Sequence, residues 1–119
     1  MPRFDYSKKK VLITGAGGYL GGRLAAQLAL LGADLVLWSN SLDPALTPEG
    51  THLIRGPLQD QSLWETALEG VDIIFHLAAQ TGVKVAEADM AKDLEANYLP
   101  VEALGSACRR KGFRPFVVL

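Results

Sequence analysis

KVLITGAGGYLG runs from Lys10 to Gly21 and sets the architecture of the chain. Its first five residues form a short apolar, β-branched run, which is typical of a strand buried on both faces of a parallel sheet. A glycine-rich turn follows, and Tyr19 to Leu31 then places leucines at helical spacing before Gly32. This strand, turn and helix predict a phosphate-binding loop. Glycines allow the backbone to approach a pyrophosphate, and the first amides of a helix favour the negative charge.

The rest of the chain continues the alternation of strands and helices. We expect further strands at Asp34–Ser39, His52–Leu58, Val71–Leu77 and Phe116–Leu119, helices at Asp60–Leu68 and Ala88–Arg110, a loose lead-in at Met1–Ser7 and a loop at Ser39–Gly50. Pro100 falls inside the longer helix, so we expect a kink there or a break near residues 97–99. The alternation predicts a Rossmann-like, doubly wound parallel α/β sheet in the order 3-2-1-4-5, with helices on both faces.

Composition argues against several classes of function. The chain has 119 residues, about one domain, and a net charge of −1, which gives no reason to expect nucleic acid or an anionic membrane as a partner. Its single cysteine, Cys108, rules out an intrachain disulfide and supports no cysteine-based metal site. We therefore expect a cytoplasmic protein with no metal site, and we expect Cys108 to be a small buried hydrophobic residue rather than a nucleophile.

The spacing of the glycines distinguishes between phosphate loops. The common pattern G-x-G-x-x-G would need glycine at position 20, where Leu20 stands, and no Lys-Ser or Lys-Thr pair follows to make a Walker A loop. The spacing that fits is Gly15, Gly18 and Gly21. It resembles the T-G-x-x-G-x-x-G loop of the short-chain dehydrogenase/reductase superfamily, and Tyr19-Leu20 resembles its extended branch, the NAD-dependent sugar-nucleotide epimerases and dehydratases. The alternative is a glycine-rich turn that binds nothing.

Two later segments resemble the same family. GVDIIFHLAAQ, residues 70–80, is similar to its fourth strand and the segment after it, which lines the nicotinamide side of the cofactor cleft. The resemblance places Leu77, Ala78 and Ala79 there. We expect His76 to have a structural role at the strand end, bonded to backbone, rather than a catalytic one. Asn97 falls where the family has an asparagine that braces the active-site region.

The adenosine end departs from the family pattern at two places. Ser39 stands where the family has an aspartate for the ribose hydroxyls. Asn40 and Asp43 are the alternatives for contacting the ribose, and no Arg or Lys follows until Arg55. Pro57 replaces the aspartate that contacts the adenine amine, which leaves the backbone of Leu58 beside the adenine. The resemblance therefore implies NAD as cofactor without excluding NADP.

The predicted cofactor contacts come from the loop, the adenosine end and the nicotinamide side. They are Gly15, Gly18, Tyr19, Leu20, Gly21, Ser39, Asn40, Leu58, Leu77, Ala78, Ala79 and Asn97.

The resemblance also implies chemistry that residues 1–119 do not contain. In the family the fifth strand leads to a catalytic Ser or Thr and then to a Tyr-x-x-x-Lys pair, whereas Tyr98 is followed four residues later by Glu102. We expect 1–119 to be the N-terminal, NAD(P)-binding part of an enzyme acting on a nucleotide-linked sugar, without its catalytic and substrate-binding C-terminal part. The alternatives are a non-catalytic NAD(P)-binding sensor or partner-binding module, and a fragment that binds cofactor too weakly to matter. Homo-oligomers would form through the helix 88–110 or the edge of the fifth strand.

Overall fold

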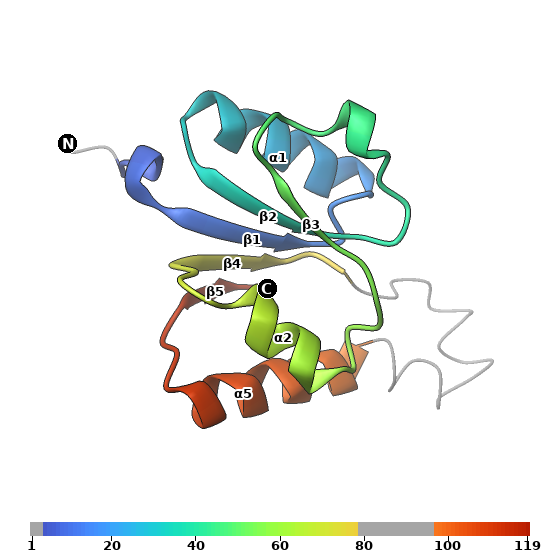
Figure 1. Ribbon diagram of the computed structural model, residues 1–119, viewed down its shortest axis with the longest axis vertical. Coiled ribbons are helices and arrows are strands. Elements are labelled where there is room, and N and C mark those ends of the chain that lie inside the picture. The colour runs from blue at the N-terminus through green and yellow to red at the C-terminus, as the bar shows by residue number, and fades with distance from the viewer. Residues whose placement is uncertain (1–3, 79–96) are drawn as a thin grey trace. The chain divides into compact units, whose positions relative to one another are not determined.

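A computed structural model describes residues 4–78 and 97–119 of the chain (Figure 1). The chain divides into two compact units, each discontinuous in sequence. The first, which we call the sheet unit, comprises Met1–Arg55, Gly70–Leu77 and Pro115–Leu119. The second, the helix unit, comprises Gly56–Glu69 and Ala78–Arg114.

The sheet unit is built on five parallel strands. In chain order they are β1 (Lys10–Thr14), β2 (Asp34–Trp38), β3 (His52–Ile54), β4 (Ile73–His76) and β5 (Phe116–Val118). Their spatial order is β3-β2-β1-β4-β5, so β1 is central and pairs with β2 on one side and β4 on the other (Figure 1). The predicted α/β, Rossmann-like sheet and its strand order are confirmed.

Apolar side chains on both faces of the central strands explain why these segments pair. One face, together with helix α1 (Tyr19–Leu30), forms a buried cluster. Its buried members are Val11, Ile13, Ala16, Ala25, Leu28, Leu35, Leu37 and Ile73. Leu12, Val36 and Ile74 alternate with these residues along the strands and are buried as well. Near-continuous apolar sequence is what a parallel strand needs when neither face meets water.

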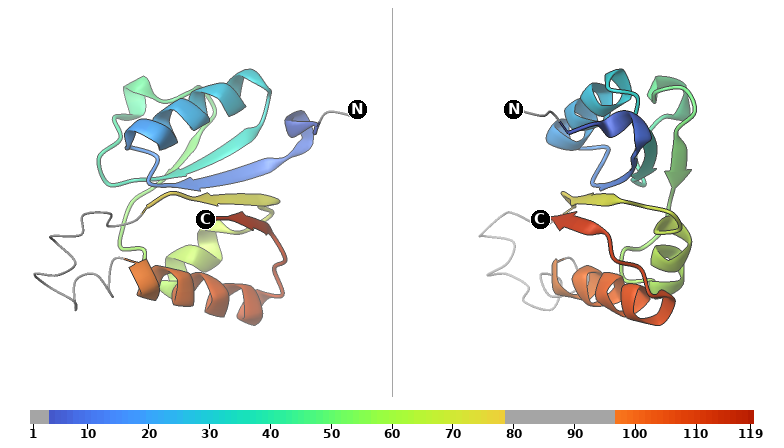
Figure 2. Two further views of the ribbon diagram at one scale, coloured as in Figure 1. Left: turned by 180° about the vertical axis from the view of Figure 1, so that it is seen from behind. Right: turned by 90° about the vertical axis from the view of Figure 1, so that its left-hand side faces the viewer.

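The helix unit contains two helices that pack against one another, α2 (Gln61–Ala67) and α5 (Leu99–Lys111) (Figure 2). Asp60 is the N-cap of α2 and accepts hydrogen bonds from the backbone amides of Ser62 and Leu63. Trp64 is fully buried, and its indole donates a 2.6 Å hydrogen bond to a backbone carbonyl just before the helix. At the other end, Gly112 closes α5 in the left-handed region, with φ 71°.

Several boundaries differ from those expected. β3 ends at Ile54 and not at residue 58, because Gly56 has φ 134° and Pro57 has no amide to donate to a ladder. The expected lead-in and the loop after β2 each contain one turn of 3-10 helix, η1 (Tyr6–Lys8) and η2 (Pro44–Leu46). Each of these turns is capped by an aspartate two residues before its centre, a local signal that the sequence analysis overlooked.

The long helix expected at 88–110 is described only from residue 97 onward. There α5 begins at Leu99, so that Pro100 lies in its first turn. A proline is tolerated in the first turn because its missing amide has no intrahelical partner to lose. Residues 97–98 are already helical, in a π-helical turn, and residues 88–96 lie outside the described part of the chain, so the expected kink or break stays a prediction.

Candidate functional site

The phosphate loop connects the end of β1 to the start of α1. Gly15 takes the left-handed conformation, with φ 67°, which turns the chain out of the strand. The amide of Gly18 then donates a 3.0 Å hydrogen bond to the carbonyl of Gly15, and Gly18 becomes the N-cap of α1. Because glycine has no side chain to cap the helix, the first-turn amides remain available to a ligand. A helix N-terminus with available amides favours an anion.

The loop has no room for side chains at two further glycines. A Cβ on Gly21 would collide with the carbonyl oxygen of Gly15 and would lie 2.9 Å from the Cα of Ala16. A Cβ on Gly17 would collide with the hydroxyl of Ser41 and lie 2.6 Å from that of Ser39. Gly17 and Gly18 are exposed, so a ligand would meet bare backbone here. The residues of this loop therefore fit the pyrophosphate of a dinucleotide.

Tyr19 and Leu20 follow the loop on the first turn of α1. Both side chains are strongly exposed, at 78% and 63% of their areas. The Arg23 guanidinium, one turn later, lies over the Tyr19 ring at 4.6 Å from its centroid. This cation–π contact orients the exposed ring beside the available amides of the helix.

The loop that follows β2, residues 39–43, is the segment expected at the adenosine side, and we call it the serine loop. The amide of Ser39 donates a 3.0 Å hydrogen bond to the carbonyl of Ile54, which fixes the start of this loop against the end of β3. The Ser39 hydroxyl then accepts a hydrogen bond from the amide of Ser41, and their hydroxyl oxygens lie 3.2 Å apart. Asn40 is exposed between them. Asp43 caps η2 by accepting from the amide of Ala45 at 2.9 Å.

The opposite side of β1 carries a buried polar pair. The hydroxyl of Thr14 and Nδ1 of His76 are 2.7 Å apart, and both residues are buried. Burial lowers the pKa of His76 below its ordinary value of 6.5, because the charged imidazolium would lose its hydration. His76 thus connects the ends of β1 and β4. This contact lies at the end of β4, where a structural role is expected for His76.

Leu77 begins the segment expected on the nicotinamide side. Its amide donates a 3.3 Å hydrogen bond to the carbonyl of Thr14, which continues the alignment of β4 with β1 beyond the strand. Leu77 is half-buried and packs at the edge of the apolar cluster. The sheet unit therefore brings together the phosphate loop, the serine loop and Leu77 at the carboxyl ends of its strands, the edge where open parallel sheets bind ligands.

Three other predicted contact residues belong to the helix unit, and one lies outside the described residues. Leu58 is half-buried, and its carbonyl accepts the hydrogen bond of the Trp64 indole. Ala78 and Asn97 are also half-buried, and Asn97 lies in the π-helical turn that precedes α5. Ala79 falls among residues 79–96, so the structure does not place it.

Three features of the site were not predictable from the sequence: Gly17, Ser41 and the contacts of Arg55. Gly17 belongs to the glycine run but not to the spacing that identifies the loop, so the motif alone gave it no role. The Ser41 hydroxyl lies beside Gly17 only because β2 pairs with β1 in register. Arg55 donates to two carbonyls of the serine loop, a contact that the pairing of β3 with β2 creates. Predicting the contacts of Ser41 and Arg55 would have required the pairing register of these strands.

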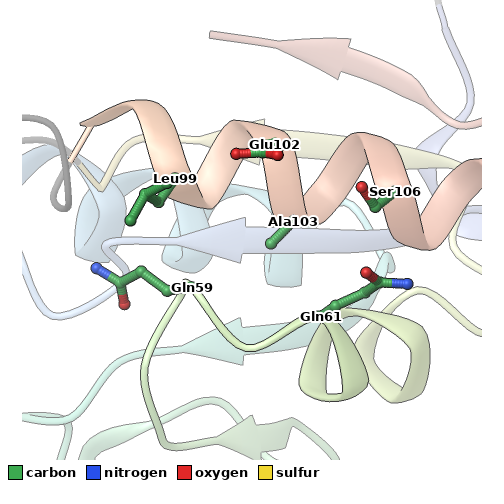
Figure 3. Close-up of a pocket in the computed structure, with 6 residues that line it drawn as sticks. All are labelled: Gln59, Gln61, Leu99, Glu102, Ala103 and Ser106. Atoms are coloured by element: carbon green, nitrogen blue, oxygen red, sulfur yellow. The ribbon is translucent and has the colours of Figure 1, made fainter.

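The helix unit has a shallow pocket of about 250 Å³ between the N-terminal side of α2 and one face of α5 (Figure 3). Gln59 and Gln61 face it from one side, and Glu102 and Ser106 from α5. Two amides, a hydroxyl and a carboxylate with no cation among the lining residues do not suit a pyrophosphate. The phosphate loop is the better candidate for the functional site.

Other kinds of site receive no support from the part of the chain that can be described. No group of three or more His, Cys, Asp and Glu side chains within 4–78 and 97–119 is placed to hold a metal ion. Over the same residues, every helix is too short or too polar to cross a membrane. Cys108 is half-buried, and burial raises the pKa of its thiol, which disfavours the reactive thiolate.

Comparisons with known proteins agree with this geometry. Short-chain dehydrogenase/reductase family 42E member 1 from Bos taurus is 36% identical over 107 residues, covering 88% of this chain and 27% of that protein. The 2-alkyl-3-oxoalkanoate reductase of Stenotrophomonas maltophilia is 34% identical over 103 residues, covering 87% of this chain and 30% of the reductase. Among solved structures, UDP-glucose 4-epimerase from Thermus thermophilus in complex with NAD matches with a TM-score of 0.74 and 30% identity, covering 87% of this chain and 34% of the epimerase.

This chain therefore spans about a third or less of the length of these relatives. The model of the NAD dependent epimerase/dehydratase family matches residues 11–119, which is nearly the whole chain. With the glycine spacing and the strand order, this match shows that the chain belongs to the NAD dependent epimerase/dehydratase family.

Proposed function

We propose that this chain binds NAD through the glycine loop between β1 and α1. The observation that carries the proposal is the helix N-terminus at Gly18, which has no side-chain cap and is preceded by the exposed, bare backbone of Gly17. A pyrophosphate there would accept hydrogen bonds from the first-turn amides and would lie in the favourable field of the helix. The solved relative that contains NAD supports the choice of ligand.

Further residues would extend the site on both sides of the pyrophosphate. The Ser39 and Asn40 segment would contact the adenosine ribose, and the backbone of Leu58 would flank the adenine. Leu77, Ala78, Ala79 and Asn97 would serve the nicotinamide half. When bound, NAD supplies a hydride acceptor, and the residues of this chain bind and orient it. Tyr19 and Leu20 would cover the pyrophosphate from the first turn of the helix.

Calorimetric titration of the chain with NAD and with ADP-ribose tests the proposal. We expect both ligands to bind, because the predicted contacts on the adenosine and pyrophosphate sides do not need nicotinamide. Gly18→Ala should weaken both by about tenfold or more, since a methyl group at this exposed N-cap would cover the amides.

Gly22→Ala, four residues away on the exposed face of α1, is the matched control and should bind normally. Absence of binding to a folded wild-type chain, or equal binding by the Gly18 and Gly22 variants, would contradict the assignment of the loop.

We further propose that the whole protein transfers hydride at a carbon bearing a hydroxyl or carbonyl oxygen. A nucleotide-linked sugar is our preferred substrate class, supported by the UDP-glucose 4-epimerase at 30% identity. The second class is a non-nucleotide ketone or alcohol, favoured by the resemblance to the 2-alkyl-3-oxoalkanoate reductase. Nicotinamide absorbance of this chain with NAD and UDP-glucose should stay constant, since residues 1–119 contain no Tyr-x-x-x-Lys pair.

Localisation and self-association complete the proposal. A single, half-buried cysteine supports a cytoplasmic location.

Self-association through the helix 88–110 or the edge of β5 stays a prediction. It is supported at β5 by the exposed side chains of Phe116 and Val117, which are 70% and 39% accessible. Light scattering across a concentration series would measure it.

A further inference from the structure

The loop after β2 presents hydroxyls where a carboxylate would select against a phosphate. The oxygens of Ser39 and Ser41 lie 3.2 Å apart, and the amide of Ser41 donates to the Ser39 hydroxyl at 3.1 Å. The nearest carboxylate along the loop is that of Asp43, which accepts from the amide of Ala45 as the cap of η2. The loop therefore offers hydroxyl donors without placing an anion at the end of β2.

A cation is fixed beside the same loop. Arg55 follows the last residue of β3, and its guanidinium donates to the carbonyls of Leu42 at 2.7 Å and Asn40 at 3.4 Å. These two bonds hold the guanidinium against the loop, while its five donors leave others for a ligand. The side chain is exposed, and among residues 4–78 and 97–119 it makes no ion pair.

The serine hydroxyls also adjoin the phosphate loop. The space that a Cβ on Gly17 would need is occupied by the oxygens of Ser39 and Ser41. A dinucleotide with its pyrophosphate on the glycine loop would thus bring its adenosine ribose toward this pair. In dinucleotide-binding sheets an acidic residue here bonds the 2′-hydroxyl and repels a 2′-phosphate, whereas a nearby arginine accommodates the phosphate.

We propose that Ser39, Ser41 and Arg55 form a site for the ribose 2′-phosphate, so that the chain binds NADP at least as well as NAD. The inference rests on the proposed function, because it requires the dinucleotide to bind along the glycine loop. The hydroxyls would donate hydrogen bonds to the phosphate oxygens. The Arg55 guanidinium would pair with their charge while still bracing the loop.

Parallel calorimetric titrations of the 119-residue chain with NAD and NADP test the inference. We expect the dissociation constant for NADP to lie below that for NAD, or within threefold of it. Arg55→Ala should raise the constant for NADP about tenfold and that for NAD less than twofold. Lys8→Ala removes the same charge at the amino-terminal end of β1, away from this edge, and should change neither constant.

Ser39→Asp provides a second, independent variant. The added carboxylate should weaken NADP binding by tenfold or more and strengthen NAD binding, because a carboxylate at this position bonds the ribose 2′-hydroxyl and repels a 2′-phosphate. An NADP constant more than threefold above that for NAD in the wild-type chain would overturn the inference. Equal weakening of both ligands by Arg55→Ala would also overturn it, since the arginine would then act only by bracing the loop.

The two proposals fail in different ways. If NAD and ADP-ribose bind while NADP is much weaker, the glycine-loop assignment stands and the 2′-phosphate site is wrong. If none of the three ligands binds to the folded chain, both proposals are wrong. Binding of NADP without detectable NAD would support the 2′-phosphate site and would contradict the proposal that the chain binds NAD.

Discussion

Gly21 and Gly22 are adjacent in α1 but differ in the space beside them. A Cβ at position 21 would collide with the backbone of Gly15, whereas at position 22 its nearest neighbour would be the carbonyl oxygen of Ala16 at 3.7 Å. We expect Gly21→Ala to lower the free energy of unfolding by about 1–3 kcal/mol through overpacking. Gly22→Ala should raise it by about 0.5–1 kcal/mol, because alanine is the better helix former. Urea unfolding of both variants measures these changes, and a loss of the same size in both would contradict the close approach at Gly21.

Protonation of His76 should make the protein less stable in mild acid. The folded-state pKa of His76 lies below 6.5, which is its ordinary value in the unfolded chain. Between these two pKa values the unfolded chain binds more protons than the folded protein does. The contribution of neutral His76 to stability is therefore fully present above about pH 6.5, and it is lost as the pH falls from 6.5 through the folded-state pKa. Asp5 and Asp60 have pKa values lowered from 3.8 and do not contribute there. Urea midpoints recorded between pH 5 and pH 7.5 measure the effect.

The matched control for this pH dependence is the other histidine. His52 is exposed, so His52→Asn should keep the pH dependence of the wild type. His76→Asn should be less stable at neutral pH, because the partner of the Thr14 hydroxyl is altered, but its stability should vary less with pH. A His76→Asn variant with the full wild-type pH dependence would show that another group is responsible.

The sequence predicts those site residues whose signals are local. Gly15, Gly18 and Gly21 lie within one motif, whose spacing and flanking elements indicate a phosphate loop without any knowledge of the sheet. Ser41 and Arg55 take their places from strands that pair across the sheet. Their roles become visible only when the register of three strands is known, which a single sequence does not specify.

At the scale of elements, the ion pair between α2 and α5 is the connection that can be tested most directly. Nε of Arg110 lies 2.5 Å from Oε1 of Glu65, and this oxygen has no well-aligned hydrogen bond among the described residues. The Arg110 side chain is 65% exposed, so solvent screens the pair. A double-mutant cycle with Glu65→Gln and Arg110→Gln should give a coupling energy of about 0.5–1 kcal/mol that decreases with added salt.

A neighbouring arginine controls for this cycle. Arg109 donates to the hydroxyl of Ser106 on its own helix at 3.1 Å and should show no coupling to Glu65 when replaced by Gln. If the coupling energy for Arg109 were as large as that for Arg110, the measured energy would come from the general effect of removing a positive charge and not from the Glu65–Arg110 pair.

The type and order of the elements follow from the sequence better than their ends do. β1 and α2 match closely, because an apolar run bounded by polar residues and an aspartate N-cap are local signals. β3 is shorter than expected, since apolar residues continue past Arg55 although the backbone at Gly56 has already left the ladder. α5 begins at Leu99, and Pro100 occupies its first turn, a position that favours proline.

For the whole molecule, cofactor binding should appear as thermal stabilisation. A ligand that binds only the folded state adds about 2.7 kcal/mol when its free concentration is a hundred times its dissociation constant. For a domain of about this size, that raises Tm by roughly 10 °C or more. Scanning calorimetry with and without NAD measures the shift, and Gly18→Ala should reduce it at the same NAD concentration. A wild-type Tm that does not change at saturating NAD would contradict binding to the folded state.

The sheet unit is assembled from three separate parts of the chain, which affects how the protein emerges from the ribosome. Met1–Arg55 supplies three strands, but β4 and β5 arrive only with Gly70–Leu77 and Pro115–Leu119. Until residue 76 has left the exit tunnel, one edge of the central strand β1 has no partner, and the apolar face built by Val11 and Ile13 lacks Ile73. Such non-local pairing is slow, and exposed strand edges attract other chains. The nascent chain therefore exposes an unpaired strand edge and an incomplete apolar face to other chains between the synthesis of β1 and that of β4.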